Sequence, residues 1–227
     1  MIQFEGLRKT YVMGEETVHA LAGVSLTIER GESVAIIGPS GSGKSSLMNI
    51  LGGLDRPSAG RYLFEGEDVG AFDDNDLAAF RSRRIGFVFQ SFQLLPRLSA
   101  LQNVELPMVY AGIDPAERRD RAASLLDRVG LGSRMGHRPT QMSGGQQQRV
   151  AIARSLANQP DLLLADEPTG ALDTQTGQDV LKLFKELNAE GLTLVIVTHD
   201  REVAAETRRR VTFRDGQIVS DDGASTR

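Results

Sequence analysis

A glycine-rich turn between an apolar run and an amphipathic stretch constrains this chain more than any other feature. The apolar run covers residues 34–37, and the turn reads Gly-Pro-Ser-Gly-Ser-Gly-Lys-Ser over residues 38–45. Apolar residues then recur at helical spacing, at Leu47, Ile50, Leu51 and Leu54. This order predicts a strand, a tight turn and a helix that buries one face.

The turn fits the phosphate-binding pattern G-x-x-x-x-G-K-[ST] in the context that the pattern requires. Its glycines permit backbone conformations that side chains forbid, so that successive N–H groups can converge on phosphate oxygens. We expect Lys44 to reach the β- and γ-phosphates and the Ser45 hydroxyl to bind Mg²⁺. The expected nucleotide-binding residues here are Gly38, Pro39, Ser40, Gly41, Ser42, Gly43, Lys44, Ser45 and Ser46. A turn without a nucleotide is the alternative, but a chance match occurs only about once per hundred chains of this length.

Composition excludes several other classes of protein. The chain has 227 residues, of which 40% are hydrophobic, enough for one core with a smaller appended subdomain. The net charge of −4, with both signs interspersed, argues against a nucleic-acid partner, and we interpret the basic residues 208–210 as a solvated helix end. The absence of cysteine excludes disulfides and thiolate zinc sites. No apolar segment is long enough to span a bilayer and no signal-peptide pattern is present, so we expect a cytosolic or peripheral protein.

The middle of the chain predicts a helical insertion in an otherwise α/β sequence. Strands are expected at residues 2–7, 22–28 and 85–89. Within residues 91–160, Asp114 is the expected N-cap of a helix with Pro115 in its first turn and Glu117 as a capping-box acid. The apolar residues 91–98 have no clear period, and they fit a subdomain core or a partner surface about equally well.

Two later motifs carry polar groups at the ends of regular elements. Ser143 is the expected N-cap of a helix, and Gly144 and Gly145 expose backbone N–H groups in its first turn. This is either an ordinary capped helix or a second anion-binding terminus. Further on, a buried strand ends in Asp166 and Glu167. Carboxylates there suit a metal ion and an attacking water, so we assign Asp166 to the metal and Glu167 as general base.

Single residues elsewhere complete the set of candidates. Tyr11 is either a core aromatic or a ring that stacks on a purine. Gln90 ends the strand at 85–89 and is weak evidence alone. Thr174 is the expected cap of a helix after Asp173, and His199 ends a buried strand at 192–198.

Together these motifs resemble the nucleotide-binding subunit of ABC transporters over essentially the whole chain. Tyr11 matches the adenine-stacking aromatic, residues 38–45 the Walker A loop and Gln90 the Q-loop. Residues 142–146, Met-Ser-Gly-Gly-Gln, match the signature sequence, with Met142 in place of the usual leucine. Asp166 with Glu167 matches Walker B, Asp173 the D-loop and His199 the switch histidine. Gly170 stands where many members have serine, which leaves that residue's part in the dimer contact open.

The resemblance implies a fold and a mechanism. The fold would be α/β, with a P-loop NTPase (RecA-like) core, an N-terminal antiparallel β subdomain and an inserted helical subdomain. One nucleotide-binding domain would cover residues 1–227, with residues 1–90 and 161–227 forming the ATP-binding core and residues 91–160 the helical subdomain.

Two chains would pair head to tail on ATP and Mg²⁺, so that Ser143, Gly144, Gly145 and Gln146 of one cover ATP on the other. Lys44, Gln90, Glu167 and His199 would be catalytic, and Ser45, Gln90 and Asp166 would hold the metal.

A narrower resemblance, over residues 85–112 and 170–173, is to the MacB and lipoprotein-releasing (LolD-like) group. It implies an integral membrane permease of the MacB/FtsX type as partner, with a periplasmic adaptor reached through it, and a place on the inner face of the cell membrane. The polar residues 220–227 favour an ATPase separate from its permease. A cell-division relative that signals without transport and, less favoured, a soluble non-transport ABC ATPase stay open as alternatives.

Overall fold

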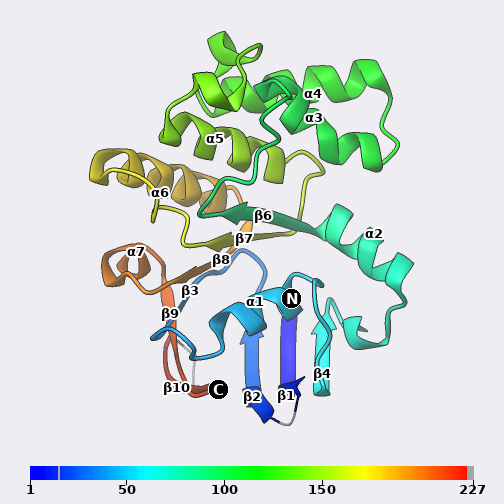
Figure 1. Cartoon of the computed structure of the whole chain (residues 1–227), viewed down its shortest axis with the longest axis vertical. Coiled ribbons are helices and arrows are strands. Elements are labelled where there is room, and N and C mark those ends of the chain that lie inside the picture. The colour runs from blue at the N-terminus through cyan, green and yellow to red at the C-terminus, as the bar shows by residue number, and fades with distance from the viewer. Residues whose placement is uncertain (15, 224–227) are drawn as a thin grey trace. The chain divides into compact units, whose positions relative to one another are not determined.

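The computed structural model describes residues 1–14 and 16–223, and their strands form an antiparallel sheet and a mixed sheet with helices (Figure 1). The chain divides into two compact units. The first consists of residues 1–81 and 193–227, and the second of residues 82–192. The last four residues of the polar tail, 224–227, lie outside the described residues.

The antiparallel sheet belongs to the first unit and has the strand order β2-β1-β4-β5. Its strands are β1 (Ile2–Met13), β2 (Glu16–Ile28), β4 (Ala59–Phe64) and β5 (Glu67–Asp68). The pairing of β1 with β2 runs from Ile2 opposite Ile28 to Met13 opposite Glu16, so the two expected strands are the base of one long hairpin. At that base the ring of Phe4 lies 4.9 Å from that of Tyr62, which builds the core against the sheet.

The other strands of the first unit follow the order β10-β9-β3-β8. They are β3 (Ser33–Ile37), β8 (Thr193–Thr198), β9 (Arg209–Arg214) and β10 (Gln217–Asp222). Strand β3 lies parallel between β8 and β9. All of β8 is buried, as expected for a strand of a parallel sheet whose middle residues, 194–197, are an apolar run. Helix α1 (Lys44–Leu51) follows β3, and the short α7 (Arg201–Ala205) follows β8.

Helix α1 ends earlier than the sequence pattern predicted. Its last residue is Leu51, because Gly52 and Gly53 follow, and Gly53 has a φ of 65°. Leu54 was predicted to lie on the buried face, but it is 51% exposed. A 3₁₀ turn (Val69–Ala71) and α2 (Asp74–Arg84) then lead from the first unit into the second.

The second unit contains a parallel pair of strands, β6 (Ile85–Phe89) and β7 (Leu162–Asp166). Its helices are α3 (Ala100–Tyr110), α4 (Pro115–Arg128), α5 (Gly144–Ser155) and α6 (Thr174–Ala189), with 3₁₀ turns at Gly132–Arg134 and Pro139–Gln141. Helices α3, α4 and α5 contribute to one buried apolar cluster, which includes Met142. Leu94 packs against this cluster whereas Leu95 is 45% exposed, so the apolar residues 91–98 divide between core and surface.

The first residues of α4, α5 and α6 test the predicted helix caps. Asp114 and Ser143 cap α4 and α5 as expected. Glu117 was predicted to be a capping-box acid, but its carboxylate forms an ion pair with Arg121, and the cap of α4 is the Asp114 carboxylate, which accepts from the Ala116 N–H. Thr174 was predicted to cap α6, but Asp173 is the cap and accepts a hydrogen bond from the Thr176 N–H.

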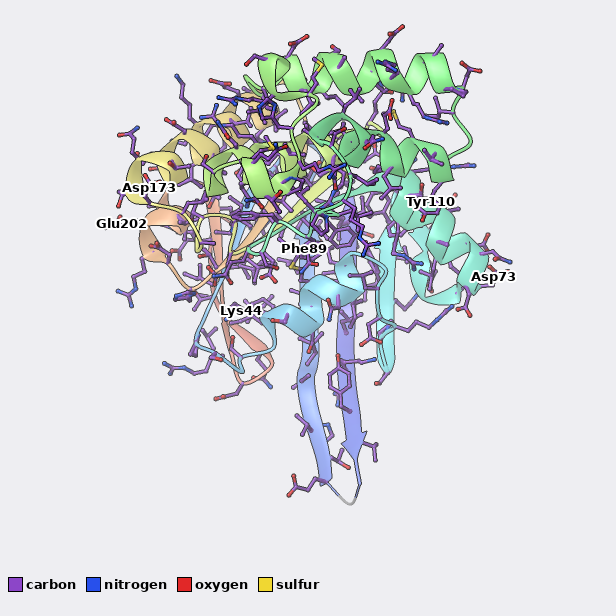
Figure 2. All side chains as sticks on the ribbon, turned by 45° about the horizontal axis from the view of Figure 1, so that its top comes forward. Lys44, Asp73, Phe89, Tyr110, Asp173 and Glu202 are labelled. Carbon is purple, nitrogen blue, oxygen red and sulfur yellow. The ribbon has the colours of Figure 1, made fainter. Side chains whose placement is uncertain are left out.

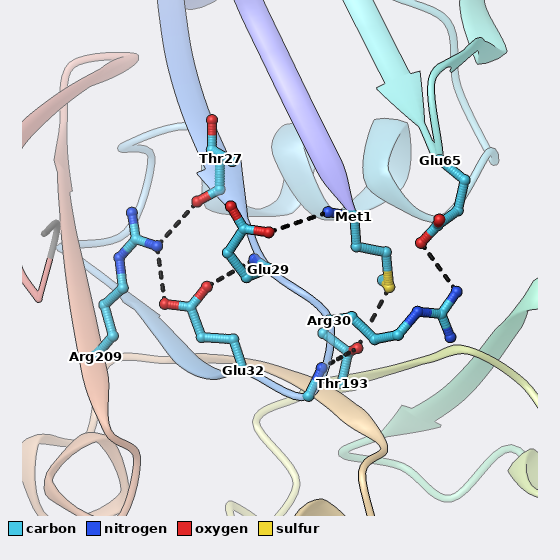
Figure 3. A network of polar contacts seen from close by, with 9 residues as sticks. Met1, Thr27, Glu29, Arg30, Glu32, Glu65, Thr193 and Arg209 are labelled. Carbon is cyan, nitrogen blue, oxygen red and sulfur yellow. Dashed lines mark hydrogen bonds and ion pairs between the residues drawn. The ribbon is translucent and has the colours of Figure 1, made fainter. Parts of the chain in front are cut away.

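The interpretation of residues 208–210 as a solvated helix end was wrong, because Arg209 is 8% exposed and begins β9 (Figure 3). Its guanidinium contacts Asp221 at 2.7 Å, Glu32 at 2.9 Å and the carbonyl oxygen of Thr27 at 2.9 Å. The hydrogen bonds with Asp221, followed by those with Glu32, raise the pKa of Arg209 above its ordinary value. The guanidinium therefore joins β2, β9 and β10.

We expect Arg209→Met to lower the free energy of unfolding by about 2–4 kcal/mol, because it leaves Asp221 and Glu32 without their cation. Arg210→Met is the matched control. Arg210 is exposed and lies 3.7 Å from Asp222, so its loss is expected to cost less than about 0.5 kcal/mol. Urea unfolding followed by circular dichroism measures both, and equal losses would contradict a structural role for Arg209.

Candidate functional site

The glycine-rich turn of the first unit is closely surrounded by backbone. A Cβ on Gly43 would lie 2.4 Å from the carbonyl oxygen of Ala20 in β2. A Cβ on Gly38 would lie 2.3 Å from the carbonyl oxygen of Phe213 in β9. Gly43 also has a φ of 100° at the N-cap of α1. Glycine is therefore required at both positions for two reasons. The turn needs its backbone freedom, and a side chain would collide with distant parts of the chain.

Hydrogen bonds hold the turn from the side of the β9–β10 hairpin. The N–H of Gly216 donates to the carbonyl oxygen of Ser42 at 3.0 Å, and the N–H of Ala22 donates to the carbonyl oxygen of Gly216 at 2.9 Å. The Ser42 side chain is 2% exposed, and among the described residues its Oγ has no hydrogen-bond partner. A buried hydroxyl of this kind fits a site that a polar ligand completes.

The turn presents donors suited to an anion. Lys44 lies at the start of α1 (Figure 2). Its Nζ donates to the carbonyl oxygens of Gly38 at 2.8 Å and Pro39 at 2.9 Å, which keeps the ammonium against the turn. The first N–H groups of a helix have no partner within it, and α1 begins at Lys44. Among the other predicted binding residues, Pro39, Ser40, Gly41 and Ser45 are exposed and Ser46 is half-buried.

Two further predicted residues lie in the first unit. Ile37 of β3 is in register with Thr198 of β8, so the turn and His199 leave the sheet from neighbouring strand ends. The N–H of Asp200 donates to Thr198 Oγ1 at 3.0 Å, which fixes the chain beside His199. Tyr11 is half-buried in β1, and its hydroxyl donates to Asp55, in the segment that follows α1.

In the second unit the parallel strands β6 and β7 bring three predicted residues to one sheet edge. Phe89 is in register with Asp166, so Gln90 and Glu167 follow paired strand ends. Glu167 has a φ of 44°, which is strained for a residue with a side chain. A Cβ on Gly170 would lie 2.6 Å from Gln90 Nε2. Glycine in place of serine at 170 therefore leaves room for the Gln90 side chain.

The first turn of α5 combines a capping box with a close-packed glycine, Gly145. Ser143 Oγ accepts from the Gln146 N–H at 3.3 Å, and Gln146 Oε1 accepts from the Ser143 N–H at 3.1 Å. The Ser143 hydroxyl proton is not used in this box. A Cβ on Gly145 would lie 2.2 Å from Thr176 Cγ2, so Gly145 also permits the contact with α6.

Asp173, predicted as part of the site, lies at the start of α6 and is exposed (Figure 2). Its carboxylate accepts from Thr176 Oγ1 at 2.6 Å and from the Thr176 N–H at 3.0 Å. These bonds, the side-chain bond foremost, lower the pKa of Asp173. The carboxylate therefore stays ionised at neutral pH.

Sequence reasoning missed two residues of α5 that hold the segments after Gln90 and Glu167. Arg154 donates to the carbonyl oxygens of Phe92 and Gln93, whose φ values of 60° and 51° are left-handed. Burial lowers the pKa of Arg154. Gln148 is fully buried and donates to the carbonyl oxygen of Pro168 at 2.6 Å. A polar side chain on the apolar face of α5 is the signal that could have identified both.

The donor types fit a hard divalent cation better than a soft one. Ser45, Gln90 and Asp166 offer hydroxyl, amide and carboxylate oxygens, the ligands that Mg²⁺ prefers. Within residues 1–14 and 16–223, no group of three or more His, Cys, Asp or Glu side chains is arranged to hold a metal by itself. No helix in the described part of the chain is long and apolar enough to cross a membrane.

Comparisons with known proteins identify the relatives of this chain. Residues 21–170 match the ABC transporter family. The chain is 58% identical to the uncharacterized ABC transporter ATP-binding protein YknY of Bacillus subtilis, over 96% of the chain and 95% of that protein. It is 53% identical to the macrolide export ATP-binding/permease protein MacB of Hyphomonas neptunium, over 98% of the chain but only 35% of that protein.

A solved structure of the ATP-binding cassette MJ0796, a dimer in a post-hydrolysis state bound to ADP and Pi, is also similar. The TM-score is 0.89 and the identity 46%, over 97% of both chains.

We expect Gly43→Ala to weaken nucleoside triphosphate binding by more than about tenfold, because the new Cβ would displace the turn from β2. Gly191→Ala is the matched control. Gly191 has a φ of 101° against 100° for Gly43, and in the described part of the chain no atom beyond its two chain neighbours lies within 4 Å of its Cβ position. Both changes introduce left-handed strain of about 1–2 kcal/mol. Calorimetric titration measures binding, and equal affinities for the two variants would refute the steric role of Gly43.

Proposed function

This chain belongs to the ABC transporter family and is an ABC-type ATPase, and on that premise we propose that it powers a MacB-type exporter. The observation that carries the proposal is the likeness of nearly the whole chain to the ATP-binding part of MacB proteins. The chain spans about a third of the length of those proteins, at 35% for the first of them. The permease and the exported cargo, whether drug, peptide or lipoprotein, are therefore part of the proposal.

In the proposed mechanism the triphosphate of ATP binds to the turn at residues 38–45. The N–H groups of the turn and of the start of α1 donate to the phosphate oxygens, and Lys44 leaves the carbonyl oxygens of Gly38 and Pro39 to bind the β- and γ-phosphates. Tyr11 stacks on the adenine. Ser45, Gln90 and Asp166 would hold Mg²⁺, and the bound ion would offset the negative charge of the phosphates.

Hydrolysis requires a positioned water and a base. Glu167 directly follows the Walker B strand β7. In this proposal its carboxylate is the general base that accepts the proton of the attacking water. His199 donates to the γ-phosphate from the neighbouring strand end of the first unit. Gln90 directly follows β6, the strand paired with β7. In this proposal its side chain couples the site of the phosphates to residues 91–98.

A second copy of the chain completes each site in this proposal. The signature residues Ser143, Gly144, Gly145 and Gln146 cover the γ-phosphate bound to the partner, with the Ser143 hydroxyl and the helix N–H groups as donors. Asp173 lies in the contact between copies. The similarity to a dimeric cassette bound to ADP and Pi supports this arrangement.

The partner proposed for the helical second unit is a MacB/FtsX-type permease, which would place the ATPase on the inner face of the cell membrane. The exposed apolar residues of that unit support this choice, because they are available to a membrane protein's cytoplasmic segment. They are Leu95 at 45% exposed, Val109 at 46% and Tyr110 at 82%. A periplasmic adaptor would be reached only through the permease.

We expect Glu167→Gln to bind ATP with an affinity within about threefold of the wild type but to lose turnover by about 10²–10⁴-fold, because the amide cannot accept the proton. The variant should also accumulate as an ATP-bound dimer in size-exclusion chromatography. Lys44→Ala is the companion variant, and it should lose ATP binding itself. Substantial hydrolysis by Glu167→Gln would remove Glu167 as the base, and unchanged affinity in Lys44→Ala would remove the phosphate role of the turn.

The exporter proposal is tested by a pull-down of tagged Glu167→Gln protein from solubilised membranes in the presence of ATP. We expect copurification of a permease with four transmembrane helices and a large outer domain. The same experiment with Lys44→Ala should recover less of it, because no ATP-bound dimer forms. A cell-division partner would favour signalling without transport, and recovery without any membrane protein would favour a soluble ATPase.

A further inference from the structure

We propose that Lys9 and Asp55 are positioning residues, which hold the Tyr11 ring as a one-sided platform for the base of the nucleotide. The proposal rests on the function proposed above, in which ATP binds at the turn of residues 38–45. It adds the reason why the ring has a fixed orientation relative to that turn.

The hydroxyl of Tyr11 is tied to the helix that follows the phosphate-binding turn. Tyr11 Oη donates to Asp55 Oδ2 at 2.9 Å. Asp55 lies four residues beyond the end of α1, and its N–H donates at 3.2 Å to the carbonyl oxygen of Asn49 within that helix. The ring is therefore anchored at its backbone in β1 and at its hydroxyl to α1. A base bound by this ring and phosphates bound by the start of α1 thus share one rigid support.

Lys9 supplies the second constraint. Its Nζ donates to Asp55 Oδ1 at 2.5 Å and to the carbonyl oxygen of Arg56 at 2.9 Å, and its side chain is only 12% exposed. The same Nζ lies 4.9 Å from the centroid of the Tyr11 ring, within the range of a cation–π contact. Because the ammonium covers one face of the ring, a planar base can stack only on the opposite face.

The charge state of Asp55 fits a permanent acceptor. Burial acts to raise the pKa of this carboxyl, but hydrogen bonds from Lys9, the Arg56 N–H and Tyr11 together lower it below its ordinary value. Asp55 is therefore ionised at neutral pH and accepts from Tyr11 and Lys9 at once. Without the carboxylate, the phenol and the ammonium would both lose their fixed partner, and ring rotation would compete with stacking.

Two roles for Asp55 predict different effects on a ligand that lacks a base. One role is to hold the Tyr11 ring as a platform for the base, and the other is to support the phosphate-binding turn. If Asp55 acts through the Tyr11 ring, its loss weakens only ligands that carry a base. If Asp55 merely stabilises α1, its loss weakens the binding of phosphates as well. Inorganic tripolyphosphate with Mg²⁺ is the base-free probe.

The experiment measures dissociation constants of the full chain for ATP and for tripolyphosphate by calorimetric titration. We expect Asp55→Ala and Tyr11→Ala each to weaken ATP binding by about tenfold and tripolyphosphate binding by less than about twofold. The double variant should be no weaker than Tyr11→Ala alone, because both act through one ring. Asp55→Asn should recover part of the affinity, since its amide oxygen still accepts from the phenol.

Asp74→Ala is the matched control. Asp74 is a carboxylate of the same unit that pairs with Arg56 at 2.9 Å and is 98% exposed, and the Tyr11 hydroxyl donates to Asp55 instead. It should change neither constant. Tyr11→Phe removes only the hydroxyl, so it tests the same bond if Asp55→Ala does not fold, and we expect a loss of about threefold for ATP alone.

Equal losses for ATP and tripolyphosphate in Asp55→Ala would overturn the proposal, as would additive losses in the double variant or unchanged ATP binding in Tyr11→Ala. A wild-type chain that binds neither ligand would instead refute the proposed function, and the positioning role with it.

Discussion

The close approach of three backbone segments at the glycine-rich turn is the constraint on which the rest of the first unit depends. Gly43 lies against Ala20 of β2, and Gly38 lies against Phe213 of β9. The Gly216 N–H then joins the hairpin beyond β9 to the carbonyl oxygen of Ser42. A turn fixed on two sides keeps its N–H groups in one orientation. Preorganised donors of this kind bind anions without losing further conformational entropy.

The second unit uses a comparable principle at the ends of β6 and β7, where strained residues are held by long polar side chains. Arg154 donates to the carbonyl oxygens of two left-handed residues, Phe92 and Gln93, and Gln148 donates to that of Pro168, next to the left-handed Glu167. Both side chains come from α5, the helix that begins with the signature residues. Movement of α5 would therefore act directly on the segments that follow Gln90 and Asp166.

Predictions that rest on a local sequence pattern had a different outcome from those that depend on tertiary contacts. The buried strands β3, β7 and β8 were predicted because each contains an apolar run between turn signals, although the predicted bounds for two of them, 34–37 and 192–198, differ by one residue from those of β3 and β8. Helix α3 was not, because its apolar residues merge with the irregular segment before it, and only the Ser99–Gln102 capping box marks its start. Tertiary contacts also explain why the interpretation of Arg209 as part of a solvated helix end was wrong. Its partner Glu32 lies far away in the sequence, and its partner Asp221 lies on another strand, β10.

The sequence by itself determined the order of strand, turn and helix, the family and the identity of the candidate site residues, because these follow from spacing and residue type along the chain. Only the tertiary structure decided that Gly170 leaves room for Gln90, that Arg154 holds the segment after it, and that Lys9 and Asp55 fix Tyr11. The physical reason is that these contacts join residues many positions apart. Their partners are set by how strands and helices pack, which no local period records.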